Sequence, residues 1–270
     1  RVGGIALEPG RVRIVPAASG VRLDVETGVR RQGEFLTEQW RRDSPLPEML
    51  GDWVRDATLT GPLRADLSMR VWPEMAREPE YDIHVDFNGA DFRPGVAGLR
   101  WQDLSGRVRY GSASGIEPTT LDARFLGEAV TMRVEEDSES ALVVRQKGSA
   151  SVDAVENWMD RSQVELAGSL DYQAVLRPTE GPLLRLDADL EQVESTLPRP
   201  LDKAVGEAHS LTATLDFSKG ERWTIDGNWN PLGAFRMAVA GGAIERGRVA
   251  LGVRSTRLPD APVLSFTGAI

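Results

Sequence analysis

The chain has 270 residues, of which 41% are hydrophobic and 27% charged, so it is a globular protein long enough to bury a substantial core. Its net charge of -9 argues against nucleic-acid binding, which requires a concentrated positive field. Cysteine is absent, which excludes a disulfide framework, a thiolate metal site and a thiolate nucleophile.

Both ends of the sequence look like cuts. Residues 1–10, RVGGIALEPG, lack the apolar segment of a signal peptide, and residues 263–270, VLSFTGAI, stop inside a predicted strand. No stretch approaches the roughly 20 apolar residues of a spanning helix. We therefore expect a fragment of a longer protein, with any membrane anchor or targeting signal outside it.

Alternation of apolar and polar residues is the dominant pattern and predicts about a dozen strands with one apolar face. The clearest examples are residues 21–27, 65–71, 81–87, 131–137, 184–190 and 211–217. Turn signals separate them, and we expect turns at 88–89, 93–95, 111–115, 218–220, 226–227 and 241–242. The fold class is therefore all-β, built largely from antiparallel sheet.

Two segments have helical spacing instead. Residues 33–57 predict two short helices divided by Pro45 and Pro47. Residues 151–160, SVDAVENWMD, predict one more, with Ser151 or Asp153 as the N-cap.

A pattern of the form L-x-G-x-L follows each helical segment, at 59–63 and again at 166–170, and alternating strands come next. We therefore predict an internal repeat, with chance similarity as the alternative. The predicted units are 1–32, the end of a preceding β repeat, then 33–150 and 151–270, each a helix followed by a β-meander.

No catalytic constellation is visible, so we expect neither an enzyme nor a cofactor. The chain has two histidines, and His84 with Asp82 and Asp86 fits a solvated strand face better than a metal site. Neither a phosphate-binding loop nor a nucleophile elbow is present. The tryptophans of the helical segments fit core packing better than a carbohydrate platform.

The apolar face of so many strands must be covered in some way. The strands could close as a barrel, stack as a sandwich, or curl into a trough that takes a non-protein ligand. The apolar phase includes small residues that leave room, which favours the trough: Ala123, Ala174, Ala188, Ala213 and Ala238.

Four stretches carry a more specific pattern, in a fixed order. They are 35–46 (FLTEQWRRDSPL) running into 59–73, then 104–134, 164–178 (VELAGSLDYQAVLRP) and 188–207 (ADLEQVESTLPRPLDKAVGE). In the last stretch Leu197, Pro198, Pro200, Leu201 and Lys203 are in register with an "LP.Pl.K" pattern. Together the four stretches resemble the YhdP family. Gln192 departs from the pattern, because it stands where the family has a glycine.

The resemblance implies a specific architecture and function. YhdP-like proteins belong to the AsmA-like group, related to TamB, and are described as periplasmic proteins anchored in the inner membrane. Their repeating β-groove carries phospholipid to the outer membrane. By resemblance we expect a long twisted antiparallel sheet curled into an open apolar groove, with a few short helices. The expected partners are phospholipid acyl chains and, through parts of the chain outside this fragment, components of both membranes.

We predict that one set of apolar side chains lines this groove, and we call them the predicted lining residues: Ile83, Val85, Phe87, Val108, Tyr110, Leu121, Phe125, Met132, Val134, Leu186, Leu211, Leu215, Met237 and Val239. The alternative function is a non-catalytic scaffold of the cell envelope, built as a closed sandwich or a solenoid. The expectation that separates the two is that Phe125→Asp or Met132→Glu blocks a groove without unfolding it but unfolds a sandwich.

Overall fold

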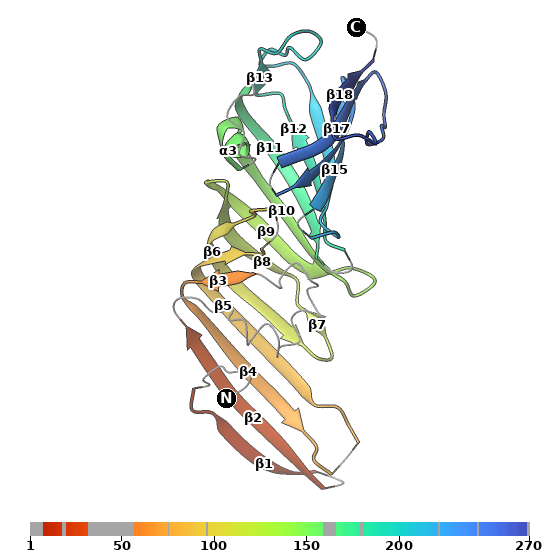
Figure 1. The fold of residues 1–270 in the computed structure, drawn as a ribbon. Coiled ribbons are helices and arrows are strands. Elements are labelled where there is room, and N and C mark those ends of the chain that lie inside the picture. The colour runs from red at the N-terminus through yellow and green to blue at the C-terminus, as the bar shows by residue number, and fades with distance from the viewer. Residues whose placement is uncertain are drawn as a thin grey trace.

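The computed structural model describes residues 8–17, 20–31, 57–74, 76–95, 97–158, 166–178, 181–220, 222–241 and 243–268. In this part of the chain, eighteen strands form one sheet and a single short helix lies beside it (Figure 1). The expected all-β class with a long, largely antiparallel sheet is confirmed.

The strands cover most of the described chain, and several are long. In the N-terminal half they are β1 (Arg11–Ala17), β2 (Gly20–Arg31), β3 (Thr58–Thr60), β4 (Leu63–Val71), β5 (Glu80–Arg93), β6 (Trp101–Gly111), β7 (Gly115–Ile116), β8 (Thr119–Phe125) and β9 (Glu128–Glu136). They continue as β10 (Leu142–Ser151), β11 (Leu166–Arg177), β12 (Leu183–Asp189), β13 (Val193–Ser195), β14 (Ser210–Asp216), β15 (Arg222–Asn230), β16 (Gly233–Ala240), β17 (Ala243–Leu251) and β18 (Leu264–Thr267).

The sheet is a meander in which each long strand pairs with the long strands before and after it. Antiparallel pairing runs without interruption from β1 through β2, β4, β5, β6 and β8 to β12, and on through β14 to β17. The short strands β3, β7 and β13 pair with β5, β6 and β11. No pairing in the described chain joins β1 to β18, so the sheet is open, and these two strands lie at its opposite ends (Figure 1).

The six alternating segments all coincide with strands, and three of them extend one residue past the strand end. β9 shows the physical reason, because Val130, Met132 and Val134 are buried while Thr131 and Arg133 between them are exposed. Alternation therefore divides each strand between two faces of the sheet.

Two of the predicted turns are wrong. Asn88-Gly89 lies inside β5, and Asp226-Gly227 lies inside β15. Gly89 has a φ of 80° where the register between β5 and β6 shifts, so it forms a bulge. Gly227 makes room instead, because a Cβ atom there would lie 2.3 Å from Cζ of Phe235 on the neighbouring strand.

A polar network stabilises the bend at the bulges of β5 and β6. The register shifts on both sides of Ala90 in β5 and again between Gln102 and Ser105 in β6. Asp91 accepts a hydrogen bond from Nη2 of Arg100 at 2.5 Å and one from the backbone N–H of Asp103 at 3.4 Å. Bulges increase local twist and bend a strand, so the C-terminal end of β5 and the N-terminal end of β6 turn away from the line of the sheet.

The helix α3 (Val152–Trp158) confirms the second helical prediction. Ser151 is the N-cap, because its Oγ accepts the backbone N–H of Ala154 at 3.2 Å. Val155 and Trp158 pack against the hydrophobic core, and Val152 is buried. The helices predicted at 33–57 lie outside the described residues, apart from Ala57.

Residues 252–263 connect β17 to β18, which pair in parallel. This segment is anchored by Arg246, whose Nη1 donates to the carbonyl oxygen of Pro259 at 3.2 Å. The prediction that Ala238 belongs to the apolar phase is wrong: Ala238 is paired with Thr224 and Arg246 and shares their polar face. Met237 and Val239 on either side of Ala238 lie on the apolar face, so the period-2 alternation of β16 itself places Ala238 on the opposite face.

The two L-x-G-x-L patterns have similar topology. Gly61, with a φ of 93°, separates β3, which pairs with the far end of β5, from β4. Gly168, with a φ of 107°, separates the start of β11, which pairs with β13, from the part that pairs with β10 and β12. The division of the chain into units at 33–150 and 151–270 stays a prediction.

Candidate functional site

A continuous row of directly paired residues crosses the sheet from β4 to β18. Residues that face each other across neighbouring strands present their side chains on the same face. The row consists of Leu63, Phe87, Gly106, Leu121, Met132, Gln146, Ala174, Leu186, Ala213, Gly227, Phe235, Val249 and Phe266. Apart from Gln146 it is apolar or glycine, and we call the face that carries it the apolar face.

The register places all the predicted lining residues on the apolar face. Ile83, Val85 and Phe87 alternate along β5, and Met237 lies two residues from Phe235 on β16. They differ in exposure: Leu121, Met132, Val134, Leu215 and Val239 are buried, whereas the others are partly exposed. Their contact with a ligand stays a prediction.

Further apolar residues on this face were missed by the sequence analysis. Leu67 is paired with Ile83, and Val25 with Met69, so the apolar face extends through β4 to β2. Val12 and Ile14 continue it onto β1, where they are 62% and 72% exposed. The signal was available, because the alternation at 21–27 and 65–71 has the same phase as these pairs.

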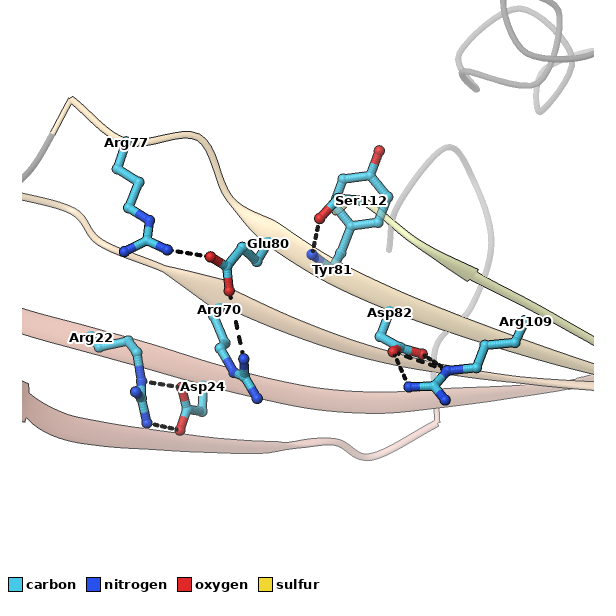
Figure 2. Close-up of polar contacts among 9 residues, drawn as sticks. All are labelled: Arg22, Asp24, Arg70, Arg77, Glu80, Tyr81, Asp82, Arg109 and Ser112. Atoms are coloured by element: carbon cyan, nitrogen blue, oxygen red, sulfur yellow. Dashed lines mark hydrogen bonds and ion pairs between the residues drawn. The ribbon is translucent and has the colours of Figure 1, made fainter. Parts of the chain in front are cut away.

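Charged side chains cover the opposite face of the N-terminal strands (Figure 2). Arg109 on β6 contacts Asp82 on β5 at 2.7 Å, and Arg22 contacts Asp24 at 2.7 Å within β2. Hydrogen bonding to Arg109 lowers the pKa of Asp82 below its ordinary value of 3.8. The two faces of the sheet therefore differ sharply in polarity.

His84 belongs to this charged face. Its Nε2 lies 2.7 Å from Oδ1 of Asp82, while Asp86 contacts Arg107 at 2.5 Å. Within the described residues, no group of three or more His, Asp or Glu side chains could hold a metal ion. Ion pairs with arginines thus account for the polar residues that the sequence places around His84.

Four aromatic side chains form a continuous cluster where the bulges bend β5 and β6. The ring centroids of Phe92 and Trp101 are 6.1 Å apart, those of Trp101 and Phe125 5.4 Å, and those of Phe125 and Tyr172 6.4 Å. These residues come from β5, β6, β8 and β11. We call the cluster the aromatic bridge, and Phe125 is its only member among the predicted lining residues.

Gln146 on β10 fastens the aromatic bridge. Its Oε1 accepts the indole N–H of Trp101 at 2.6 Å, and its Nε2 donates to the hydroxyl oxygen of Tyr172 at 2.5 Å. All three side chains are buried. Burial raises the pKa of Tyr172 to about 12, so the phenol stays protonated at neutral pH.

The bridge changes the expectation for Met132. From the sequence, Met132→Glu is expected to leave the fold of an open groove intact, but Met132 is paired with Gln146 and is only 6% exposed. A carboxylate there would be buried without a described cation to pair with it, so we now expect Met132→Glu to unfold the protein.

The LPRPLDK segment forms an ordered loop around a buried lysine. Nζ of Lys203 donates to the carbonyl oxygens of Val193 at 2.7 Å, Ala204 at 3.0 Å and Glu191 at 3.3 Å. An ammonium group has three donors, so all are used and the loop is fixed in place. The structure thus explains the lysine of the motif through these hydrogen bonds.

In the described part of the chain, no helix is long and apolar enough to cross a membrane.

Comparison with known proteins identifies a family. No curated protein and no solved structure matches the chain. A family model described as "YhdP protein" matches residues 1–268, so the chain belongs to the YhdP family.

Proposed function

We propose that this chain is a segment of a periplasmic bridge that shields lipid acyl chains and conducts phospholipid between the inner and outer membranes. In this proposal the parent protein is anchored in the inner membrane, and other parts of it contact the membrane components at each end. Family membership supports a role in the cell envelope and a non-catalytic transport function.

The observation that carries the proposal is an apolar face that continues across an open sheet. Several bulky side chains on this face are partly exposed, including Ile83 and Val85 near one end and Phe235 and Met237 near the other, whereas others such as Leu215 and Val239 are buried. Soluble monomers rarely expose long continuous apolar surfaces. Each CH₂ group of a lipid kept from water contributes about 0.8 kcal/mol, so a face of this kind can hold an acyl chain without a polar anchor.

Native mass spectrometry of the chain purified without detergent, followed by lipid extraction, tests the proposal. We expect bound phospholipid with the wild-type chain. Leu211→Lys places a charge on the apolar face beside Ala188 and Trp229 and should remove the lipid.

Thr212→Lys is the matched control. Thr212 is the next residue on β14 and is paired with Asp187 on the opposite face, where a lysine can form an ion pair. The Thr212→Lys chain should retain the lipid in native mass spectrometry, and circular dichroism should show that its fold is intact. A lipid-free wild-type chain that unfolds cooperatively would contradict the proposal and favour a structural scaffold.

A further inference from the structure

The aromatic bridge spans strands that are not neighbours. Trp101 is on β6 and Gln146 on β10, and β8 and β9 lie between them in the sheet. Three strand spacings amount to about 14 Å in a flat sheet. The hydrogen bond of 2.6 Å between Trp101 and Gln146 therefore requires these side chains to extend across β8 and β9.

Apolar residues on the two strands that the bridge crosses are shut off from solvent. Leu121 on β8 and Met132 on β9 are paired with each other in the row and are 5% and 6% exposed. Gly148 also makes room for the bridge, because a Cβ atom there would lie 3.3 Å from the hydroxyl oxygen of Tyr172. Ile83 and Met237, on either side of the bridge, are partly exposed.

The bridge thus crosses the apolar face between two regions, around Ile83 and around Met237, in which bulky side chains are partly exposed. An acyl chain lying on β4 and β5 and one lying on β14 to β16 would be separated by the rings of Trp101, Phe125 and Tyr172. A ligand that moves along the row of paired residues must cross β8 and β9, and the bonded side chains of Trp101 and Gln146 span these two strands.

Two features permit the side chain of Trp101 to swing away from Gln146 without disrupting the rest of β6. It is the first residue of β6, and the register shift between Gln102 and Ser105 separates it from the regular part of the strand. A single side chain, Gln146, bonds it to Tyr172 within apolar surroundings. A directional bond of this kind gives two discrete states, fastened and released, in place of a continuous range.

We propose that Trp101, Gln146 and Tyr172 form a gate across the apolar face, which opens to let a single lipid acyl chain pass between its two halves. The proposal rests on the proposed function and specifies the point at which passage is controlled. An acyl chain can pass such a gate because it is narrow, flexible and apolar. It offers no group that replaces Gln146 as the hydrogen-bonding partner of the indole. Closure is therefore restored after the chain has passed.

Site-specific photocrosslinking tests the gate. An aliphatic diazirine amino acid is placed singly at Ile83, Met132 and Met237, and the chain is incubated with phosphatidylethanolamine–phosphatidylglycerol vesicles before illumination. In the wild-type background we expect lipid adducts at positions 83 and 237 and at least fivefold fewer at position 132. Trp101→Ala should raise the adducts at position 132 to the level of the other two.

Two further variants make the result specific. Gln146→Leu removes both hydrogen bonds but keeps the rings, and it should give an intermediate yield at position 132 even if Trp101→Ala fails to fold. Trp223→Ala removes a buried aromatic residue that packs against Phe217, away from the bridge, and should leave the yield at position 132 unchanged. Circular dichroism checks the fold of each variant.

The outcomes separate the gate from the proposed function. Equal adducts at all three positions in the wild-type chain would overturn the gate alone. The gate would also be overturned if position 132 stayed unlabelled in the folded Trp101→Ala and Gln146→Leu variants while positions 83 and 237 were labelled. Absence of adducts at 83 and 237 in every folded variant would overturn the proposed function, and the gate with it.

Discussion

Nζ of Lys203 lies 2.7 Å from the carbonyl oxygen of Val193, and this contact ties the LPRPLDK loop to the strand β13. The backbone N–H of Ser195 and that of Lys203 each donate to the other residue's carbonyl oxygen, at 2.9 and 3.0 Å. A lysine that is only 3% exposed and bonded to three carbonyl groups is a fixed structural element.

We predict that Lys203→Met destabilises the protein by about 2 kcal/mol, because it leaves three carbonyl groups with one hydrogen bond fewer at a buried site. Urea denaturation measures the loss. Lys219→Met, in an exposed turn, is the control and should change the free energy of unfolding by less than about 0.5 kcal/mol. Equal effects of the two substitutions would contradict the structural role of Lys203.

Gly168 is predicted to be required where β11 changes partner. A Cβ atom at this position would lie 2.1 Å from the carbonyl oxygen of Gln192, and the φ of 107° is itself unfavourable for other residues. We expect Gly168→Ala to cost about 3 kcal/mol and to loosen the pairing of β11 with β13.

Gly206→Ala separates the two causes. Gly206 has a φ of 88°, but a Cβ atom there would have no neighbouring atom within 4 Å, so its substitution should cost only about 1 kcal/mol. Thermal unfolding of both variants provides the comparison. A cost for Gly168→Ala no greater than that for Gly206→Ala would show that contact with Gln192 is relieved by a small backbone shift.

Strands and faces were predictable because alternation is a local property. Met132, Met237 and the other predicted lining residues share one face, since a strand with polar or small residues at every second position has one bulky apolar side. The N-cap at Ser151 was predictable for the same reason, because the side chain and the N–H that it binds are three residues apart.

The aromatic bridge was not predictable, because it depends on register. Trp101 meets Gln146 only when the pairings of β6, β8, β9 and β10 are all known and the bulges have bent the sheet. The glycines at 89 and 227 show a related limit. A glycine signals a turn, a bulge or room for a neighbouring ring, and Asn-Gly or Asp-Gly alone does not distinguish these.

Acid should weaken the charged face of β5 and β6. Hydrogen bonding to Arg109 lowers the pKa of Asp82 in the folded state below 3.8, so this group stabilises the fold above pH 3.8 and loses the effect as the pH falls through the lowered value. We expect the urea midpoint of the wild-type chain to fall between pH 4 and pH 2 more steeply than that of Asp82→Asn. Asp171→Asn, an exposed carboxylate on β11, is the control and should keep the wild-type slope.

His209 is predicted to link stability to pH nearer neutrality. Burial, with the nearby charge of Lys203, lowers its pKa below 6.5, and its neutral Nδ1 accepts the indole N–H of Trp229 at 3.1 Å. Because the folded state disfavours the proton, the stabilisation is fully present above pH 6.5 and is lost as the pH falls toward the lowered value. His209→Gln should flatten the dependence of the unfolding midpoint between pH 7 and pH 5.

Proton NMR measures the same linkage directly. The chain has only two histidines, so the His209→Gln spectrum identifies which imidazole resonance belongs to His209. We expect that resonance to titrate below pH 6.5 in the folded chain. Its pKa should rise in Trp229→Phe, because phenylalanine keeps an aromatic ring but lacks the N–H that the neutral imidazole accepts. A His209 resonance that titrates at or above pH 6.5 would mean that burial and the charge of Lys203 do not favour the neutral imidazole.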